Sequence, residues 1–104
     1  MRRLAFSDAA LDNLADIQNY IARESGRGVA EALGENIVAL CERLASLPGT
    51  LGTARPDLAA DMRSTPHRGY TLHFRYGDAL LEIIAVLEAH RDAIAYFGEA
   101  LPDD

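Results

Sequence analysis

The most regular feature of the sequence is a stripe of apolar residues that recurs every three or four positions over one long segment. Its members are Val29, Leu33, Ile37, Leu40, Leu44 and Leu47. This spacing places all of these side chains on one face of an α-helix. Pro48-Gly49 ends the pattern, because neither residue favours continuation of a helix. We therefore expect an amphipathic helix that buries one face against another part of the chain.

The segment before this helix carries the same kind of pattern. Apolar residues recur at helical spacing from residue 11 to residue 21. Ser7-Asp8 offers an N-cap and a carboxylate at the positive end of the helix. Residues 25–28 (Ser-Gly-Arg-Gly) close it, since glycine tolerates the left-handed conformation in which helices often end. Because so short a turn joins them, the two helices must lie antiparallel as a helical hairpin.

The period changes to two in the second half of the chain. Apolar residues at 70, 72, 74 and 76 alternate with polar ones, which predicts a half-buried strand. Residues 77–78 (Gly-Asp) are a two-residue hairpin signal, and the almost continuously apolar residues 80–87 suit a central strand covered on both faces. Residues 62–66 and 2–6 read as shorter strands, and residues 92–101 as a short docked helix or loop.

These elements predict a single α+β domain over residues 1–104. The order is β-α-α-β-β-β: an N-terminal strand, an antiparallel helical hairpin and a three-stranded antiparallel meander. By the rules of layer packing, the hairpin covers one face of a small, mostly antiparallel sheet. We expect the other face to be partly open.

The charge of the chain limits its partners. All ten basic residues are arginine, and sixteen acidic residues bring the net charge to −6. This balance argues against bulk nucleic-acid binding, and the lack of lysine excludes Schiff-base and P-loop lysine mechanisms. The single cysteine, Cys41, can form neither an intramolecular disulfide nor a multi-cysteine metal site, and we expect it to be buried. We expect no metal, cofactor or membrane span, and a cytoplasmic location.

The arginines are unevenly distributed along the chain. Residues 62–76 hold Arg63, Arg68 and Arg75 and no acid, so this stretch carries +3 and the remainder −9. If residues 67–69 form the turn, residue 63 lies opposite residue 73, and Arg63 shares a face with His73 and Arg75. Such a face would bind partner carboxylates or phosphates bidentately. The alternative is a solvated sheet face whose arginines pair with nearby acids (Asp57, Asp61 or Glu88).

A second polar cluster, residues 88–92 (Glu-Ala-His-Arg-Asp), follows the presumed central strand. Strand ends are common functional positions, but a plain polar strand exit with an Arg91–Asp92 pair explains the same residues. The sequence contains no HExxH, no GxSxG, no paired-cysteine spacing and no phosphate-binding glycine loop. Metal and nucleophile chemistry therefore have no support.

Four segments of the chain carry a family resemblance over residues 4–97. They are LDNLADIQNYIARESG, LASLPGTLG, ARPDLAADMRSTPHRGYTLHFRY and LEIIAVLEAHRD. In this combination the chain resembles the ParE/RelE superfamily of type II toxin–antitoxin toxins. It is more similar to ParE than to RelE, because its helical hairpin is long and its charge is acidic.

The resemblance implies a toxin of a plasmid-stabilisation type of module, neutralised by a cognate ParD-like antitoxin that wraps around it. ParE-like toxins poison DNA gyrase, so gyrase is the implied target. Two positions of this chain differ from the sequence pattern of the family. Many ParE-like toxins carry histidine and arginine where this chain has Glu88 and His90. If those positions bind the cellular target, the change weakens or redirects the toxin.

The resemblance leaves three functions open. The first is a non-enzymatic toxin that binds a protein target, for which the candidate target- or antitoxin-binding residues are Arg63, His67, Arg68, His73, Arg75, His90 and Arg91. The second is a RelE-like ribosome-dependent mRNA endoribonuclease, for which the catalytic candidates are Arg63, His73, Arg75 and Tyr76. The third is a degenerate toxin that only binds its antitoxin. We favour the first, since a chain of −6 is poorly steered to the ribosome.

Overall fold

The computed structural model describes residues 2–100, so residue 1 and residues 101–104 of the predicted domain lie outside it. The elements are β1 (Arg3–Phe6), α1 (Asp8–Ser25), α2 (Arg27–Ser46), β2 (Thr53–Ala54), β3 (Arg63–His67), β4 (Tyr70–Tyr76), β5 (Leu80–Glu88) and α3 (Ala93–Ala100). This order confirms the predicted α+β class and its β-α-α-β-β-β core. The structure adds the two-residue strand β2 and resolves the C-terminal segment as a helix rather than a loop.

The strands form one sheet in the order β1-β5-β4-β3-β2. β3, β4 and β5 are neighbours and antiparallel, which confirms the predicted meander. β1 lies parallel to β5, so the sheet is mixed rather than wholly antiparallel. The long connection between β1 and β5 permits this pairing, because parallel strands need a crossover connection between them.

Local chemistry sets the ends of the helices. The hydroxyl of Ser7 accepts a hydrogen bond from the Ala10 amide at 3.0 Å and donates one to the Ile84 carbonyl at 2.7 Å, so the N-cap of α1 is also tied to β5. Gly26 alone separates α1 from α2, and its φ of 99° is one that L side chains rarely adopt. The predicted turn of four residues is therefore a single glycine.

The main core lies between the helical hairpin and one face of the sheet. Its largest fully buried members are Ile37 and Cys41 of α2 and Leu72, Phe74, Leu81, Ile83 and Val86 of the sheet. Cys41 is buried as predicted, and burial raises the pKa of its thiol to about 12. A buried neutral thiol of this kind behaves as a small apolar side chain.

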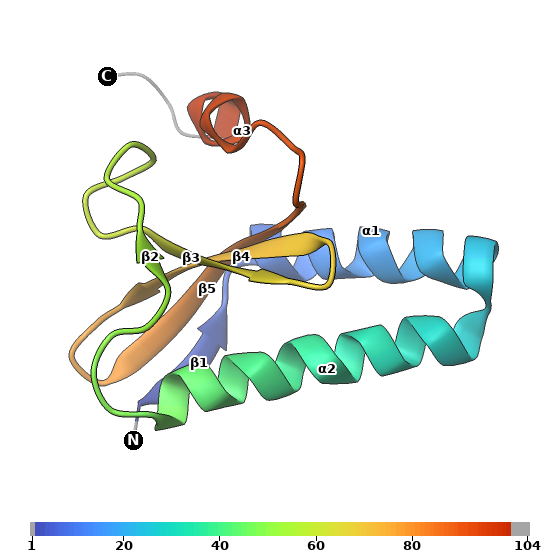
Figure 1. The fold of residues 1–104 in the computed structure, drawn as a ribbon, viewed down its shortest axis with the longest axis horizontal. Helices are drawn as coiled ribbons and strands as arrows, with labels where there is room; N and C mark the ends of the chain where they lie inside the picture. Colours follow the sequence, from blue (N-terminus) through green and yellow to red (C-terminus); the bar gives the residue numbers. More distant parts are fainter. Residues whose placement is uncertain (1, 101–104) are drawn as a thin grey trace.

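The opposite face of the sheet, which we expected to be partly open, is covered by α3 over part of its area. Phe97 of α3 is 4% exposed and packs with Met62, Ala85 and Leu87 in a second apolar cluster. Figure 1 shows α3 standing apart from the helical hairpin. The sheet is thus the middle layer of three in this region.

Two predicted turns differ in the structure. The β3–β4 turn consists of two residues, Arg68 (φ 48°) and Gly69 (φ 88°), so His67 pairs with Tyr70 and residue 63 pairs with residue 74. Positive φ at both central residues is the signature of a tight hairpin turn that matches strand twist. The predicted three-residue turn is therefore wrong. The β4–β5 turn is longer than predicted, because Tyr76 pairs with Leu81.

The hairpin of α1 and α2 extends beyond the sheet. In Figure 1 the turn between α1 and α2 projects past the β3–β4 turn. The sheet therefore covers only the end of the hairpin that lies away from the α1–α2 turn. Among the described residues, no helix is long and apolar enough to cross a membrane.

Candidate functional site

A groove runs along α1 where the helical hairpin meets the edge of the sheet at the β3–β4 turn. It consists of two adjoining cavities with volumes of about 190 and 550 Å³, which we call the inner and outer parts of the hairpin groove. Tyr20, Tyr70 and Glu88 line both parts. The groove therefore joins α1 to the start of β4 and the end of β5.

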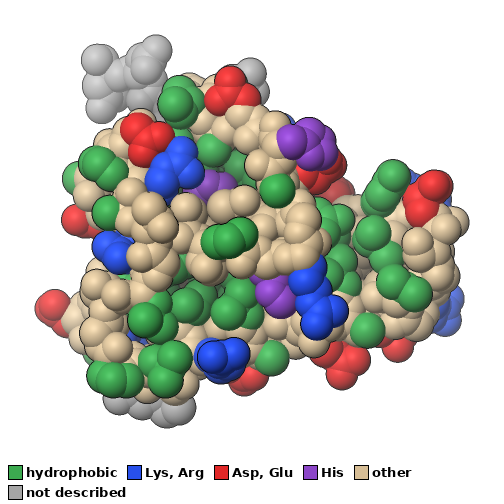
Figure 2. All heavy atoms as spheres, viewed as in Figure 1, with side chains coloured by type: hydrophobic (Ala, Val, Ile, Leu, Met, Phe, Trp, Pro, Cys, Tyr) green, Lys and Arg blue, Asp and Glu red, His purple; other side chains and the backbone are tan. Residues whose placement is uncertain are grey.

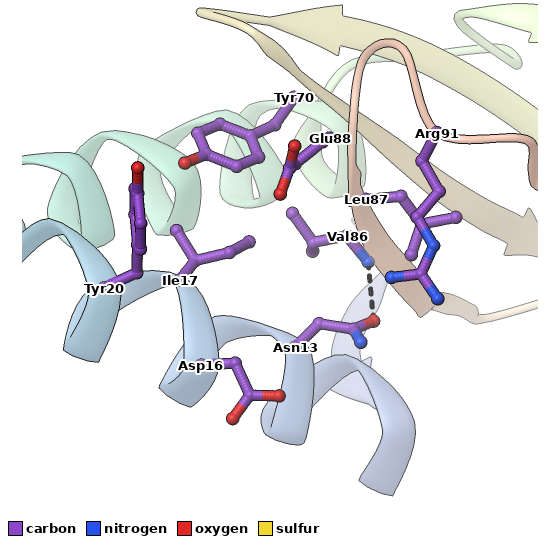
Figure 3. Close-up of a pocket in the computed structure, with 9 residues that line it drawn as sticks. All are labelled: Asn13, Asp16, Ile17, Tyr20, Tyr70, Val86, Leu87, Glu88 and Arg91. Carbon is purple, nitrogen blue, oxygen red and sulfur yellow. Dashed lines mark hydrogen bonds between the residues drawn. The ribbon is translucent and has the colours of Figure 1, made fainter.

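The inner part has an apolar floor and a polar rim (Figure 3). Ile17 and Val86 form the floor, and Asp16 and Arg91 lie at the edges. The side-chain oxygen Oδ1 of Asn13 accepts a hydrogen bond from the Val86 amide at 3.0 Å. This bond fixes the Asn13 side chain, since the amide group can then turn only its nitrogen toward the opening.

The outer part is more apolar and faces solvent. It is lined by Ile21, Val29 and Leu33 of the hairpin and by Arg68 of the β3–β4 turn. Val29 is 52% exposed although it belongs to the regular apolar stripe of α2. Figure 2 shows hydrophobic side chains gathered on the part of the molecule that projects past the sheet. An uncovered apolar surface beside a basic residue is typical of a protein-binding site.

Charged groups of both signs surround the groove. Glu88 approaches His90, with 3.1 Å between the carboxylate and the Nε2 atom. The guanidinium of Arg91 lies 5.0 Å from the ring centre of Tyr96, in a cation–π contact. The pKa of Tyr70 is raised by burial first, and then by the charge of Glu88 and by Tyr20.

The structure brings three of the predicted binding residues to this groove. Arg68 lines its outer part, Arg91 lines its inner part, and His90 contacts Glu88 at its rim. His67 lies at the end of β3 beside Arg68, where burial and then the charge of Arg68 lower its pKa. The Nε2 atom of His67 is buried without a hydrogen-bond partner among the described residues.

His73 lies elsewhere, and its predicted exposure is wrong. The side chain is 1% exposed, under α3, and its ring meets that of Phe97 edge-on with 5.2 Å between centroids. Neither ring nitrogen has a hydrogen-bond partner among the described residues. Burial lowers the pKa of His73 to about 4, with smaller opposing effects from Arg55 and Asp57. The histidine is thus neutral near pH 7.

The predicted arginine face does not form. Arg63 lies opposite Phe74, so it points to the other face of the sheet from His73, whereas Arg75 shares the face of His73 by strand alternation. The Nε and Nη2 atoms of Arg63 donate to the carbonyls of Leu51 and Gly52 at 2.7 and 2.9 Å. Arg75 pairs with Glu82 at 3.2 Å on the surface. In Figure 2 the arginines lie apart from one another rather than in one patch.

Tyr76 also has a structural role. Its hydroxyl donates to the Leu44 carbonyl and accepts from the Leu51 amide, each at 3.2 Å. Arg2 lies over its ring, 4.4 Å from the centroid. Among residues 2–100 no three histidine, cysteine, aspartate or glutamate residues come close enough to hold a metal ion.

The sequence analysis missed the groove residues Asn13, Asp16, Tyr20 and Tyr70. The two tyrosines count among the apolar positions of a helix and a strand, which hides their place in the groove. Tyr70 directly follows Gly69, but Tyr20 lies six residues before Gly26, so no spacing in the sequence marks the pair.

Residues 4–93 match the family model described as the ParE toxin of the type II toxin–antitoxin system parDE. The chain belongs to the ParE toxin family. It is therefore a type II toxin–antitoxin toxin. No curated protein matches the chain.

Two solved structures illustrate the fold. The chain is similar to the chromosomal ParDE toxin–antitoxin system from P. aeruginosa, with 19% identity and a TM-score of 0.70 over 85% of this chain and 96% of that one. It is also similar to the isolated E. coli RelE toxin, with 25% identity and a TM-score of 0.53 over 96% and 95% of the two chains. A third match is an E. coli RelE mutant in complex with an antitoxin RelBc peptide, with 24% identity and a TM-score of 0.50 over 99% and 97%.

Proposed function

We propose that this ParE-family toxin acts in the cytoplasm, inhibits growth by binding a protein target rather than by cleaving RNA, and is neutralised by a cognate ParD-like antitoxin. DNA gyrase is the first target to test, because the resemblance to ParE toxins implies it. The observation that carries the proposal is that His73, the candidate general base, is buried against Phe97 and does not line the cavity that Arg63 and Tyr76 share.

RNA cleavage requires a general base and a general acid within hydrogen-bond reach of one phosphodiester. His73 is buried under α3 and neutral, and the hydroxyl of Tyr76 is held by two backbone groups. Arg63 is bound to loop carbonyls, and Arg75 to a carboxylate. Arg63, Arg75 and Tyr76 thus have structural partners and His73 is buried, which supports a binding toxin over a ribonuclease.

The hairpin groove is the surface we assign to protein binding. The solved RelE structure with an antitoxin RelBc peptide, and the ParDE system from P. aeruginosa, support an antitoxin as its occupant. The groove has what such a site needs: an apolar floor, a charged rim, and Tyr20 and Arg68 on its walls, since tyrosine and arginine are enriched where binding energy concentrates.

The proposal is tested by expressing the toxin under tight control, with and without its antitoxin, and following growth, gyrase cleavage complexes and mRNA integrity. We expect growth arrest, accumulated gyrase cleavage complexes, intact transcripts and rescue by the antitoxin. Cleaved transcripts with normal gyrase would favour the ribonuclease. Antitoxin binding without any growth defect would favour the degenerate toxin.

Two arginine variants link the activity to the groove. Arg68→Ala removes a charge from the groove, and we expect a several-fold loss of toxicity or antitoxin affinity. Arg43→Ala removes an equally exposed charge from α2 outside the groove and should change neither. Equal behaviour of the two variants would count against the groove as the binding surface.

A further inference from the structure

Three side chains lie where the two parts of the hairpin groove meet. Tyr20 projects from α1 and is 54% exposed, while Tyr70 and Glu88 are directly paired across β4 and β5. Paired residues of antiparallel strands point to the same face of the sheet. Figure 3 shows the hydroxyl of Tyr70 pointing toward Tyr20, with the Glu88 carboxylate beside the Tyr70 ring.

This combination favours a positively charged group. The face of an aromatic ring is electron-rich and attracts cations, and two rings with a carboxylate beside them strengthen that attraction. One oxygen of the Glu88 carboxylate, Oε2, approaches His90, whereas the structure gives Oε1 no partner among the described residues. Glu88 can therefore accept a further donor without losing its contact with His90.

The chain's own arginines do not fill this position. Arg91 lies on the other side of Glu88 from Tyr20 in Figure 3, and its guanidinium is over the ring of Tyr96. Arg68 lines only the outer part of the groove. The groove beside Tyr20, Tyr70 and Glu88 is thus open to a cation from another molecule.

Charge indicates which molecule supplies that cation. The hairpin, residues 8–46, holds seven carboxylates against three arginines and carries a net charge of −4. A second copy of this chain, itself at −6, would be repelled from the hairpin. A basic segment of a different protein would be attracted to it. Arginine fits better than lysine, because its planar guanidinium can stack on a ring and bind a carboxylate at the same time.

We propose that Tyr20, Tyr70 and Glu88 form a receptor for an arginine side chain of the cognate antitoxin, whose neighbouring apolar residues lie in the outer part of the groove. The identity of the partner rests on the proposed function; the receptor itself does not. The receptor would account for part of the toxin's selectivity for its antitoxin, since it discriminates by charge as well as by shape.

The receptor is tested first with a small probe, N-acetylarginine amide, added to the free toxin and followed by NMR. The matched control is N-acetylcitrulline amide, which has nearly the same shape and no charge. We expect shifts at Tyr20, Tyr70 and Glu88 with arginine only. Glu88→Gln should weaken binding about fivefold, as for the loss of one exposed ion pair. Equal shifts with both probes, no shifts with either, or unchanged binding by Glu88→Gln would overturn the receptor.

Further variants test whether the aromatic ring of Tyr20 itself contributes to probe binding. Tyr20→Leu keeps an apolar side chain but removes the aromatic face, so probe binding should weaken, whereas Tyr20→Phe should bind normally. Glu35→Gln removes a carboxylate from α2 outside the groove and should also bind normally. If Tyr20→Leu binds the probe as well as the natural chain does, the aromatic part of the receptor is wrong.

The antitoxin is tested by calorimetry with the purified cognate antitoxin. Glu88→Gln should lower its affinity about fivefold or more, and Glu35→Gln should not. Equal affinity for both variants would overturn the antitoxin as the source of the arginine. Toxicity and gyrase inhibition are measured separately. Their absence would contradict the proposed function, whereas the probe titration alone decides whether the three residues bind an arginine side chain.

Discussion

His73 predicts an unusual dependence of stability on pH. Its pKa lies at about 4 in the folded protein, against an ordinary value of 6.5, because burial penalises the charged ring. The unfolded chain therefore binds a proton in a range where the folded chain does not. A histidine whose pKa is depressed by folding contributes its full stability above about pH 6.5, and that stability is lost as the pH falls toward 4.

The magnitude follows from the two pKa values. At about pH 7 roughly a quarter of the unfolded histidine is protonated, and at about pH 5 nearly all of it is, while the folded ring stays about nine-tenths neutral at the lower pH. Integration over this range gives a loss of about 2 kcal/mol in the free energy of unfolding from His73 alone. Arg55 and Asp57 act on the pKa of the ring in opposite directions, and burial has the larger effect.

The assay is urea denaturation of the natural chain and of His73→Leu at both pH values. Leucine fills a similar space without the two unpaired ring nitrogens, so at about pH 7 we expect the variant to be about 1 kcal/mol more stable. It should also lack the 2 kcal/mol loss at about pH 5. Other titrating groups, such as His67, are common to both proteins and cancel in the difference. Parallel pH profiles, or an NMR titration of His73 near 6.5, would refute the burial of this ring.

Three further outcomes are expected from the packing. The thiol of Cys41 is buried and has a pKa of about 12, so at about pH 8 a thiol reagent should modify the native protein at least about 100-fold more slowly than the urea-unfolded chain. Tyr76→Phe removes a hydroxyl that bridges two backbone groups, including the Leu44 carbonyl, and should lower the free energy of unfolding by about 1–2 kcal/mol in urea. Gly49 and Gly52 have nearly the same positive φ, but a Cβ would meet a strand carbonyl and an aromatic ring only at the second. The alanine variant at Gly52 should therefore lower the melting temperature clearly more than that at Gly49, which should cost about 1 kcal/mol.

Periodicity was enough to predict most of this fold. The two helices and the strands of the meander follow from spacings of three to four and of two, which report which side chains must be buried together. Their order then leaves few arrangements, because a helical hairpin between two strands acts as a crossover connection. The parallel pairing of β1 with β5 depends on contacts distant in sequence, and no local pattern encodes it.

The predicted arginine face failed because it rested on a three-residue turn between β3 and β4. The two-residue turn places Arg63 opposite Phe74 instead of opposite His73. The two-residue turn directs the charge of Arg63 toward the core face of the sheet, which is costly for a charge without partners. In the structure that cost is met by two carbonyls of the loop before β3, a contact that no pattern within the strand encodes.

The apolar stripe of α2 explains why the toxin presents a groove at all. Its residues Ile37 and Leu44 are buried under the sheet, whereas Val29, on the same face of the helix, is 52% exposed. A helix of 20 residues is about 30 Å long, and the sheet covers only part of it. The sequence thus specifies a longer apolar face than the chain itself can bury. An uncovered face of this kind lowers solubility, and the proposed antitoxin would complete the layer, with Tyr20 and Glu88 at the boundary between the two proteins.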